Sequence, residues 1–187
     1  IGFDRSVTLI QDFTESTRLL GDAVYSLDIG SGTSIYDAVY LASREKLRHE
    51  TGRKAIILIS DGEDTTSRVK RDKSLISAHQ GDTVIYSISN ALPTRGFFGR
   101  RRSGDMGTLK TLSEETGGAV FVLDNRSNFE DIFAQIAEEL RTQYSLGYVS
   151  TNLKKDGKYR RIKIIPRDKR LKVRARKGYY AADENSN

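Results

Sequence analysis

Three short apolar runs, each bounded by polar residues, mark the middle of the chain. They are Ala55–Ile59, Thr83–Ile88 and Ala119–Leu123. Continuous apolar runs of this length are typical of strands buried on both faces of a parallel sheet. We therefore expect three neighbouring parallel strands in the core of the molecule.

Helical periodicity occupies the segments around those runs. The predicted helices are Thr17–Leu27, Ser34–His49, Ser67–His79, Asp105–Thr116 and Asn128–Arg141. An alternation of strands and helices implies right-handed crossovers that place helices on both sides of the sheet. The pattern predicts an α/β fold with a doubly wound, mostly parallel sheet.

The amino-terminal end of the chain follows another pattern. Ile1–Phe3 and Val7–Ile10 flank a short polar turn, which indicates an antiparallel hairpin. Between the second and third apolar runs, Asn90–Gly104 is polar and rich in glycine, so we expect a loop there.

The carboxyl-terminal end is rich in β-forming residues separated by turn residues. The expected strands are Gln143–Val149, Tyr159–Pro166 and Leu171–Arg176. The predicted organisation is a domain over residues 1–142, an antiparallel β appendage over residues 143–180 and a disordered tail over residues 181–187.

Composition narrows the possible classes of function. The chain has 187 residues, 31 Lys and Arg against 25 Asp and Glu, and no Cys. The absence of Cys excludes disulfides, Cys-ligated zinc, iron–sulfur clusters and thiol catalysis. Only His49 and His79 are present, so no site can hold several histidines; both are expected at the surface or at helix ends. No run approaches the ~18 apolar residues that a membrane span needs.

The first candidate site follows the Ala55–Ile59 run. Asp61 comes directly after it and opens an acidic segment that also contains Glu63 and Asp64. Ligands of open parallel sheets bind at the carboxyl ends of the strands, and carboxylates there are suitable for Mg²⁺, Ca²⁺ or Mn²⁺. The alternative is that these residues form a turn and cap the next helix.

The second candidate is Gly30–Ser34, which precedes the helix predicted from Ile35. Glycines before a helix can bring backbone amides close to an anion, and hydroxyls can ligate a metal. The segment lacks the Lys of a P-loop. The alternative is an ordinary loop with a Ser or Thr cap.

In combination, these motifs resemble a known family. SGTSIYDA followed by KAIILISDGEDT is similar to the von Willebrand factor type A domain, in particular to its bacterial VWFA-related branch. Four further segments resemble that family in the same order: FDRSVTLIQDFT, LSEETGGAVF, AEELRTQYSLGYV and LKVRARKGYYA. The resemblance covers nearly the whole chain and implies a Rossmann-like fold with a non-enzymatic role in protein binding or adhesion.

The resemblance also implies a site for Mg²⁺ or another divalent cation, usually completed by an acidic group from a protein partner. Thr33 and Asp61 match the Thr and the later Asp of that site. The Asp-x-Ser-x-Ser motif that supplies the other ligands is absent from the chain. Because two ligands are too few for tight Mg²⁺ binding, we expect weak or no binding here.

That motif follows the first strand of the family, and the chain begins at what resembles the second strand. One hypothesis is that the chain is the amino-terminally truncated piece of a longer protein. Another is that a later segment, such as part of the β appendage, fills the gap left in the sheet. The resemblance also implies an extracytoplasmic or secreted location, which the residues themselves do not decide.

Protein recognition, metal-assisted in the intact protein, is therefore the expected function. One alternative is binding of nucleic acid or another anionic polymer through Arg95, Arg100–Arg102 and the basic carboxyl-terminal hairpin, although these residues also suit solvated strand faces. A metal-assisted hydrolase using Asp61, Glu63 and Asp64 ranks last, because no nucleophile or second acid–base partner accompanies them.

Overall fold

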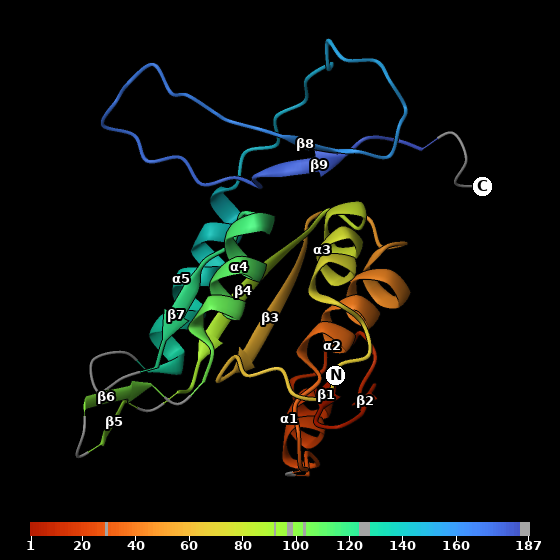
Figure 1. Ribbon diagram of the computed structural model, residues 1–187. Coiled ribbons are helices and arrows are strands. Elements are labelled where there is room, and N and C mark those ends of the chain that lie inside the picture. The colour runs from red at the N-terminus through yellow and green to blue at the C-terminus, as the bar shows by residue number, and fades with distance from the viewer. Residues whose placement is uncertain (29, 92, 97–98, 103, 124–127, 184–187) are drawn as a thin grey trace.

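A three-stranded parallel sheet forms the centre of the molecule (Figure 1). The computed structural model describes residues 1–28, 30–91, 93–96, 99–102, 104–123 and 128–183, with the backbone alone for 93–96 and 99–102. The strands are β3 (Lys54–Ser60), β4 (Thr83–Ser89) and β7 (Val120–Val122), in the order β3-β4-β7. All three coincide with the apolar runs of the sequence, which confirms the predicted core strands.

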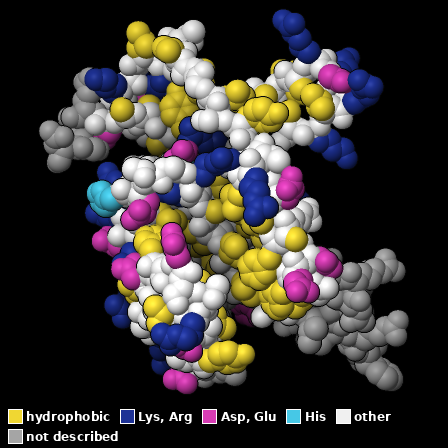
Figure 2. All heavy atoms as spheres, turned by 180° about the vertical axis from the view of Figure 1, so that it is seen from behind, with side chains coloured by type: hydrophobic (Ala, Val, Ile, Leu, Met, Phe, Trp, Pro, Cys, Tyr) yellow, Lys and Arg dark blue, Asp and Glu magenta, His cyan; other side chains and the backbone are white. Residues whose placement is uncertain are grey.

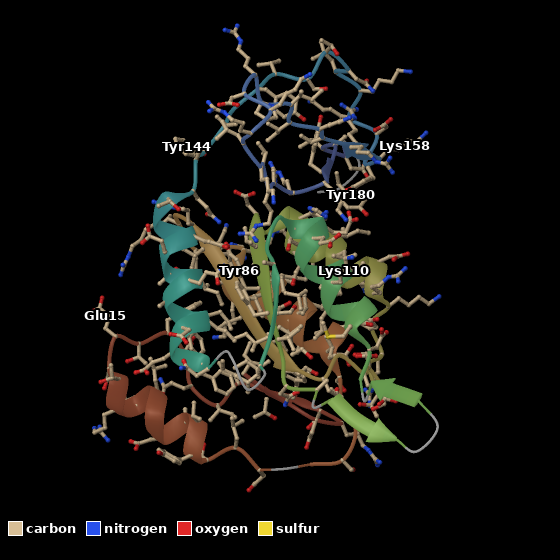
Figure 3. All side chains as sticks on the ribbon, turned by 90° about the vertical axis from the view of Figure 1, so that its left-hand side faces the viewer. Glu15, Tyr86, Lys110, Tyr144, Lys158 and Tyr180 are labelled. Atoms are coloured by element: carbon tan, nitrogen blue, oxygen red, sulfur yellow. The ribbon has the colours of Figure 1, made fainter. Side chains whose placement is uncertain are left out.

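Helices cover both faces of this sheet. One face packs against α2 (Ile35–Leu41), α3 (Arg71–Gln80) and α4 (Met106–Thr116), and the other against α5 (Phe129–Thr142) (Figure 1). The buried residues of the first face are Ile35, Val39, Leu58, Leu75, Ala78, Ile85, Leu109 and Leu112. Those of the second are Tyr86, Ile88, Ile132 and Ile136, with Tyr86 lying beneath α5 (Figure 3). The predicted α/β fold is confirmed.

Two of the predicted helices differ from those observed. The helix that begins at Ile35 changes after Leu41 into a π-helix over Ala42–Leu47. The helix predicted from Ser67 begins only at Arg71. The reason is that the Ser67 hydroxyl and the backbone amides of the next two residues bond to the start of α2, as described below. These contacts hold residues 67–70 as a loop.

The amino-terminal hairpin is a separate sheet. It pairs β1 (Gly2–Phe3) with β2 (Val7–Thr8) and leads to α1 (Thr17–Tyr25), which is capped by the Ser16 hydroxyl. Within the described residues, no strand pairs with the edge of β3 that faces away from β4.

Hydrophobic residues of β3 and of α5 are partly exposed. Ile57 and Ile59 of β3 are 39% and 41% exposed, and Phe129 and Phe133 of α5 are each 40% exposed. Figure 2 shows hydrophobic side chains gathered in the middle of that face of the molecule. The hypothesis that part of the appendage fills the gap is wrong for the described residues, because the appendage lies at another end of the molecule (Figure 1).

A short hairpin replaces the loop predicted over Asn90–Gly104. β5 (Pro93–Gly96) pairs antiparallel with β6 (Gly99–Arg102). The prediction was wrong because a polar composition does not remove the need of backbone groups for partners, and pairing of the two halves satisfies them. Pro93 stands at the first position of its strand, where a missing N–H is tolerated.

The appendage contains less sheet than predicted. Only β8 (Tyr159–Arg161) and β9 (Gly178–Tyr180) pair, and the strands expected over Gln143–Val149 and Leu171–Arg176 are absent. In the second of these segments, two of the three alternating basic side chains attach the appendage to the body instead. Arg174 pairs with Glu139 of α5, and Arg176 pairs with Asp82 at 2.9 Å.

The carboxyl-terminal tail is ordered at its beginning. The Ala181 amide donates to the Lys158 carbonyl at 3.0 Å, and Asp183 forms a β-bridge with Asp156. The prediction of disorder from residue 181 is therefore wrong for residues 181–183, because backbone pairing continues past β9. Residues 184–187 lie outside the described residues.

An aromatic cluster attaches the appendage to α3. The rings of Tyr159 and Tyr180 lie 5.1 Å apart, and both pack edge-on against His79, at 5.9 and 6.0 Å. His79 lies in the last turn of α3, which confirms the expected helix-end position, but it is only 8% exposed because the appendage covers it, so it is not at the surface. Burial lowers the pKa of His79, although nearby Glu115 acts in the opposite direction.

Candidate functional site

The candidate site lies at the carboxyl-terminal edge of the sheet, where β3 ends. Ser60, the last residue of β3, accepts the Gly62 amide on its hydroxyl at 3.1 Å, which turns the chain sharply after the strand. Gly62 has a φ of 90°, and a Cβ there would lie 2.2 Å from the Asp105 carbonyl oxygen. The loop that contains Asp61 therefore packs directly against the backbone before α4.

The backbone at Gly104, before α4, comes equally close to the backbone of Asp61. A Cβ at Gly104 would lie 2.1 Å from the Asp61 carbonyl oxygen, and Gly104 has a φ of 96°. Asp105 then caps α4, accepting from the Gly107 amide and the Thr108 hydroxyl. These hydrogen bonds, the Thr108 hydroxyl first, lower the pKa of the Asp105 carboxyl. Asp105 is thus an ionised residue beside the Asp61 loop.

The loop that contains Thr33 is bonded to the chain that follows Asp61. The Thr33 amide donates to the Thr65 hydroxyl at 2.9 Å, and the Thr33 carbonyl accepts from the amides of Thr65 and Thr66 at 2.9 and 3.1 Å. The Ser34 and Thr66 hydroxyls are 2.8 Å apart. The structure therefore brings the two predicted loops together, with Thr33 bonded through its backbone.

A reciprocal set of bonds joins the start of α2 to the same loop. The Tyr36 amide donates to Asp64 Oδ1 at 3.2 Å and to the Ser67 hydroxyl at 3.0 Å. The Ser67 hydroxyl donates to Asp64 Oδ1 at 2.6 Å. In return, Asp37 Oδ1 accepts the amides of Arg68 and Val69 at 3.1 and 2.7 Å. Each segment thus satisfies backbone amides of the other.

Sequence reasoning missed Asp37 and Ser67. The spacing Ser34-x-x-Asp37 before a helix is that of a capping box, and this signal was available. The local motif would still have given the wrong partners, because Ser34 makes no side-chain cap and bonds Thr66 instead.

Asp4 adds a carboxylate to this edge from the amino-terminal hairpin. The Thr66 hydroxyl donates to the Asp4 carbonyl at 3.4 Å, and a Cβ at Gly30 would lie 1.9 Å from Asp4 Oδ2. Bonds from the Ser6 amide and hydroxyl lower the pKa of the Asp4 carboxyl. No sequence motif pointed to Asp4, because only the fold places the hairpin beside the Gly30 loop.

The acidic residues of the Asp61 loop differ in how far their carboxylates are already occupied by hydrogen bonds within the protein. Asp61 is half-buried and accepts the Glu63 amide at 3.1 Å, whereas the Glu63 side chain is exposed. Asp64 is committed to the bonds with Ser67 and Tyr36. The turn-and-cap alternative therefore describes Asp64 well, and only Asp61 and Glu63 are left to meet a ligand.

These residues do not form a closed metal site by themselves. Mg²⁺ takes about six oxygen ligands, most often with more than one from protein carboxylates or substrate phosphates. Within the described ranges, no group of three or more His, Asp or Glu side chains is arranged to hold a metal ion. Thr33 and Asp61 remain the predicted ligands, and this pair alone does not fit Mg²⁺.

The arginine-rich candidate cannot be placed in the same way. The side chains of Arg95 and Arg100–Arg102 lie outside the described residues, as do Phe97 and Phe98.

In the described part of the chain, no helix has both the length and the apolar character required to cross a bilayer.

The geometry defines the class as an α/β domain that has interlocked loops at the carboxyl-terminal edge of a parallel sheet.

No family model matches the chain, and neither does any curated protein. Several solved structures are similar to it, among them the following three. One, a conserved hypothetical protein BatB from Bacteroides thetaiotaomicron, has 18% identity over 67% of this chain and 70% of that chain, with a TM-score of 0.48.

The other two are also bacterial. An aerotolerance-related membrane protein from Bacteroides fragilis has 17% identity over 72% of this chain and 77% of that chain, with a TM-score of 0.49. An uncharacterized membrane spanning protein from Vibrio fischeri has 22% identity over 73% of this chain and 72% of that chain, with a TM-score of 0.38. At these values the likeness is distant and concerns the fold.

Proposed function

We propose that this chain is a non-enzymatic protein-recognition domain of the von Willebrand A type, which binds its partner through the carboxyl-terminal edge of the sheet. The observation that carries the proposal is the bonding of the Thr33 loop to the loop that follows Asp61. Loops that are held by a rigid scaffold and by one another present a preformed surface, which lowers the entropy cost of binding.

The chemistry of this surface favours recognition over catalysis. Asp61 and Glu63 are accessible oxygen ligands, whereas Asp64 is engaged in fixing α2. A hydrolase would need a nucleophile or a second acid–base group within hydrogen-bond reach of the first. A metal-assisted form of recognition requires oxygen ligands in addition to Thr33 and Asp61.

Site-specific photocrosslinking tests the recognition face. A photoreactive phenylalanine analogue replaces Glu63 on the face or, as a control, Glu15, which lies before α1 and away from this edge (Figure 3). We expect a discrete protein adduct from position 63 that disappears when Asp61→Ala is added, and none from position 15. Equal adducts from both positions would contradict the proposal.

Calorimetry with MgCl₂ and MnCl₂ tests the metal separately. We expect dissociation constants no tighter than about 1 mM for this chain, because so few ligands are present.

The same preparation is assayed with generic phosphoester substrates. Turnover that depends on Asp61 would establish the hydrolase alternative instead.

A further inference from the structure

Charge is divided unequally between the two parts of the chain. Residues 143–183 carry 13 Lys and Arg against 3 Asp, a net charge of +10, whereas residues 1–142 carry 18 against 21, a net charge of −3. The formal charge of +6 for the whole chain therefore conceals a basic appendage on a weakly acidic body. Such an asymmetry attracts anionic surfaces and polymers.

Attachment of the appendage uses only part of this charge. Arg174, Arg176 and Lys177 pair with Glu139, Asp82 and Glu114 of the body. Seven other basic residues have no ion-pair partner within the described part of the chain: Lys154, Lys158, Arg161, Lys163, Arg167, Lys169 and Lys172. These cations are available to an external partner.

Aliphatic side chains accompany the unpaired cations. Leu146, Val149, Leu153, Ile165 and Leu171 are each between 61% and 88% exposed. Figure 2 shows hydrophobic side chains between basic groups on the appendage. Because each such side chain gains free energy when it leaves water, the surface favours a partner that offers an apolar phase as well as negative charge.

The position of the appendage leaves this surface accessible. It lies across the amino-terminal edge of the sheet, and its two long arms extend to either side of β8 and β9 (Figure 1). Tyr180 points towards the body, where it packs on His79 (Figure 3). Tyr144 and Lys158, in contrast, are exposed to solvent (Figure 3). Among the helices and strands that the structure describes, none covers the side of the appendage away from the body (Figure 1).

We propose that residues 143–183 bind the surface of an anionic phospholipid bilayer. Lys and Arg would lie at the lipid phosphates, and the exposed aliphatic side chains would enter the boundary between headgroups and acyl chains. This inference goes beyond the proposed recognition function, because it concerns the opposite end of the sheet. Binding in this orientation would leave the Asp61 face directed away from the lipid.

The exposed apolar side chains of the appendage are mostly aliphatic, which favours lipid over a single-stranded nucleic acid as the partner. Binding of unpaired bases relies on exposed aromatic faces. In the appendage, Tyr159 and Tyr180 pack against His79, so the exposed rings are chiefly those of Tyr144 and Tyr148, beside a larger number of exposed aliphatic side chains. Aliphatic side chains add no comparable stacking with bases, but they do add affinity for lipid.

Vesicle flotation tests the proposal with two sets of substitutions and a matched control. The charge variant is Lys163→Glu, Lys169→Glu and Lys172→Glu, and the aliphatic variant is Leu153→Ser, Ile165→Ser and Leu171→Ser. The control is Arg48→Glu, Arg68→Glu and Lys70→Glu, three exposed basic residues of the body. Thermal melting by circular dichroism verifies that each variant folds.

The full chain should bind vesicles with about 30% phosphatidylglycerol and leave pure phosphatidylcholine unbound. The charge variant should lose at least about tenfold in affinity, and the control should remain within about twofold. The aliphatic variant should lose mainly the binding that survives about 0.5 M salt, because screening removes the electrostatic part. Because the charge and aliphatic variants change only residues of the appendage, their result does not depend on the Asp61 face.

Three outcomes would overturn the proposal. They are equal binding to neutral and anionic vesicles, equal losses in the charge variant and the control, and absence of vesicle binding. If the last is accompanied by tight, salt-sensitive binding of single-stranded DNA, the surface is a nucleic-acid site instead.

Discussion

The α/β body and the appendage are stabilised by different interactions. Fully buried aliphatic residues fill the body on both sides of the sheet, for example Leu112 on one side and Ile88 on the other. The appendage is attached by ion pairs from Arg174, Arg176 and Lys177 and by the ring cluster around His79. Burial of apolar surface depends little on moderate NaCl concentration or on pH, whereas ion pairs respond to salt and a buried imidazole responds to pH.

Truncation of a leucine should separate the two regions most clearly. Leu112→Ala removes a side chain with no exposed surface and should lower the free energy of unfolding by about 3 kcal/mol. Leu171→Ala removes a side chain that is 61% exposed and should change it by less than about 0.5 kcal/mol. Urea denaturation followed by circular dichroism measures both. Similar losses at the two positions would mean that the appendage has a core of its own.

Removal of a carboxylate should have a smaller effect on stability than truncation of a buried leucine, and the effect should again differ between the body and the appendage. Asp37 Oδ1 accepts two backbone amides of the loop before α3, so Asp37→Ala should cost about 1.5 kcal/mol. Asp168 pairs with Arg170 on the exposed appendage, and its removal should leave the unfolding midpoint unchanged. Asp37→Asn, which retains an acceptor, is expected to fall between wild type and Asp37→Ala. A loss at Asp168 equal to that at Asp37 would refute this contrast.

The pH dependence gives the smallest effect. Burial lowers the pKa of His79 in the folded state below its ordinary value of 6.5. The unfolded chain therefore binds more protons as pH falls through 6.5, and stability decreases on the acidic side. The slope should not exceed about 1.4 kcal/mol per pH unit, the limit for one proton.

The groups that face His79 act in both directions. Glu115 and Asp82 raise its pKa, and Arg176 lowers it. His79→Gln should flatten the dependence of the unfolding free energy between about pH 5 and pH 7. The exposed His49→Gln serves as the control and should retain the slope. An unchanged slope in His79→Gln would show that another group is responsible.

The sequence predicted the body better than the appendage, and the reason is physical. Runs such as Ala55–Ile59 show burial on both faces directly, because a buried parallel strand has no polar side. In the appendage, alternation over Leu171–Arg176 was interpreted as a strand, but the alternate side chains reach the body as ion pairs. Extended backbone with alternating residues looks the same in sequence, whether or not a neighbouring strand exists.

The candidate site was predictable only in outline. The position of Asp61 after a buried strand indicated the correct edge of the sheet, and the structure places the Thr33 loop against the same loop. The bonds that link these loops join residues about 30 positions apart, from Tyr36 to Ser67 and from Asp37 to Val69. No local spacing rule identifies such pairs. The metal ligands Thr33 and Asp61 remain a prediction.

The open edge of β3 has a consequence for the behaviour of this chain at high concentration. Lys54–Ser60 contains no Pro, no Gly and no acidic residue, and no strand within the described residues pairs with its outer side. Short β-forming segments of low charge at a sheet edge are templates for pairing between molecules and for amyloid-like aggregation. Only Lys54, at its start, acts as a gatekeeper. The strand that organises the interior is therefore also where self-association would begin.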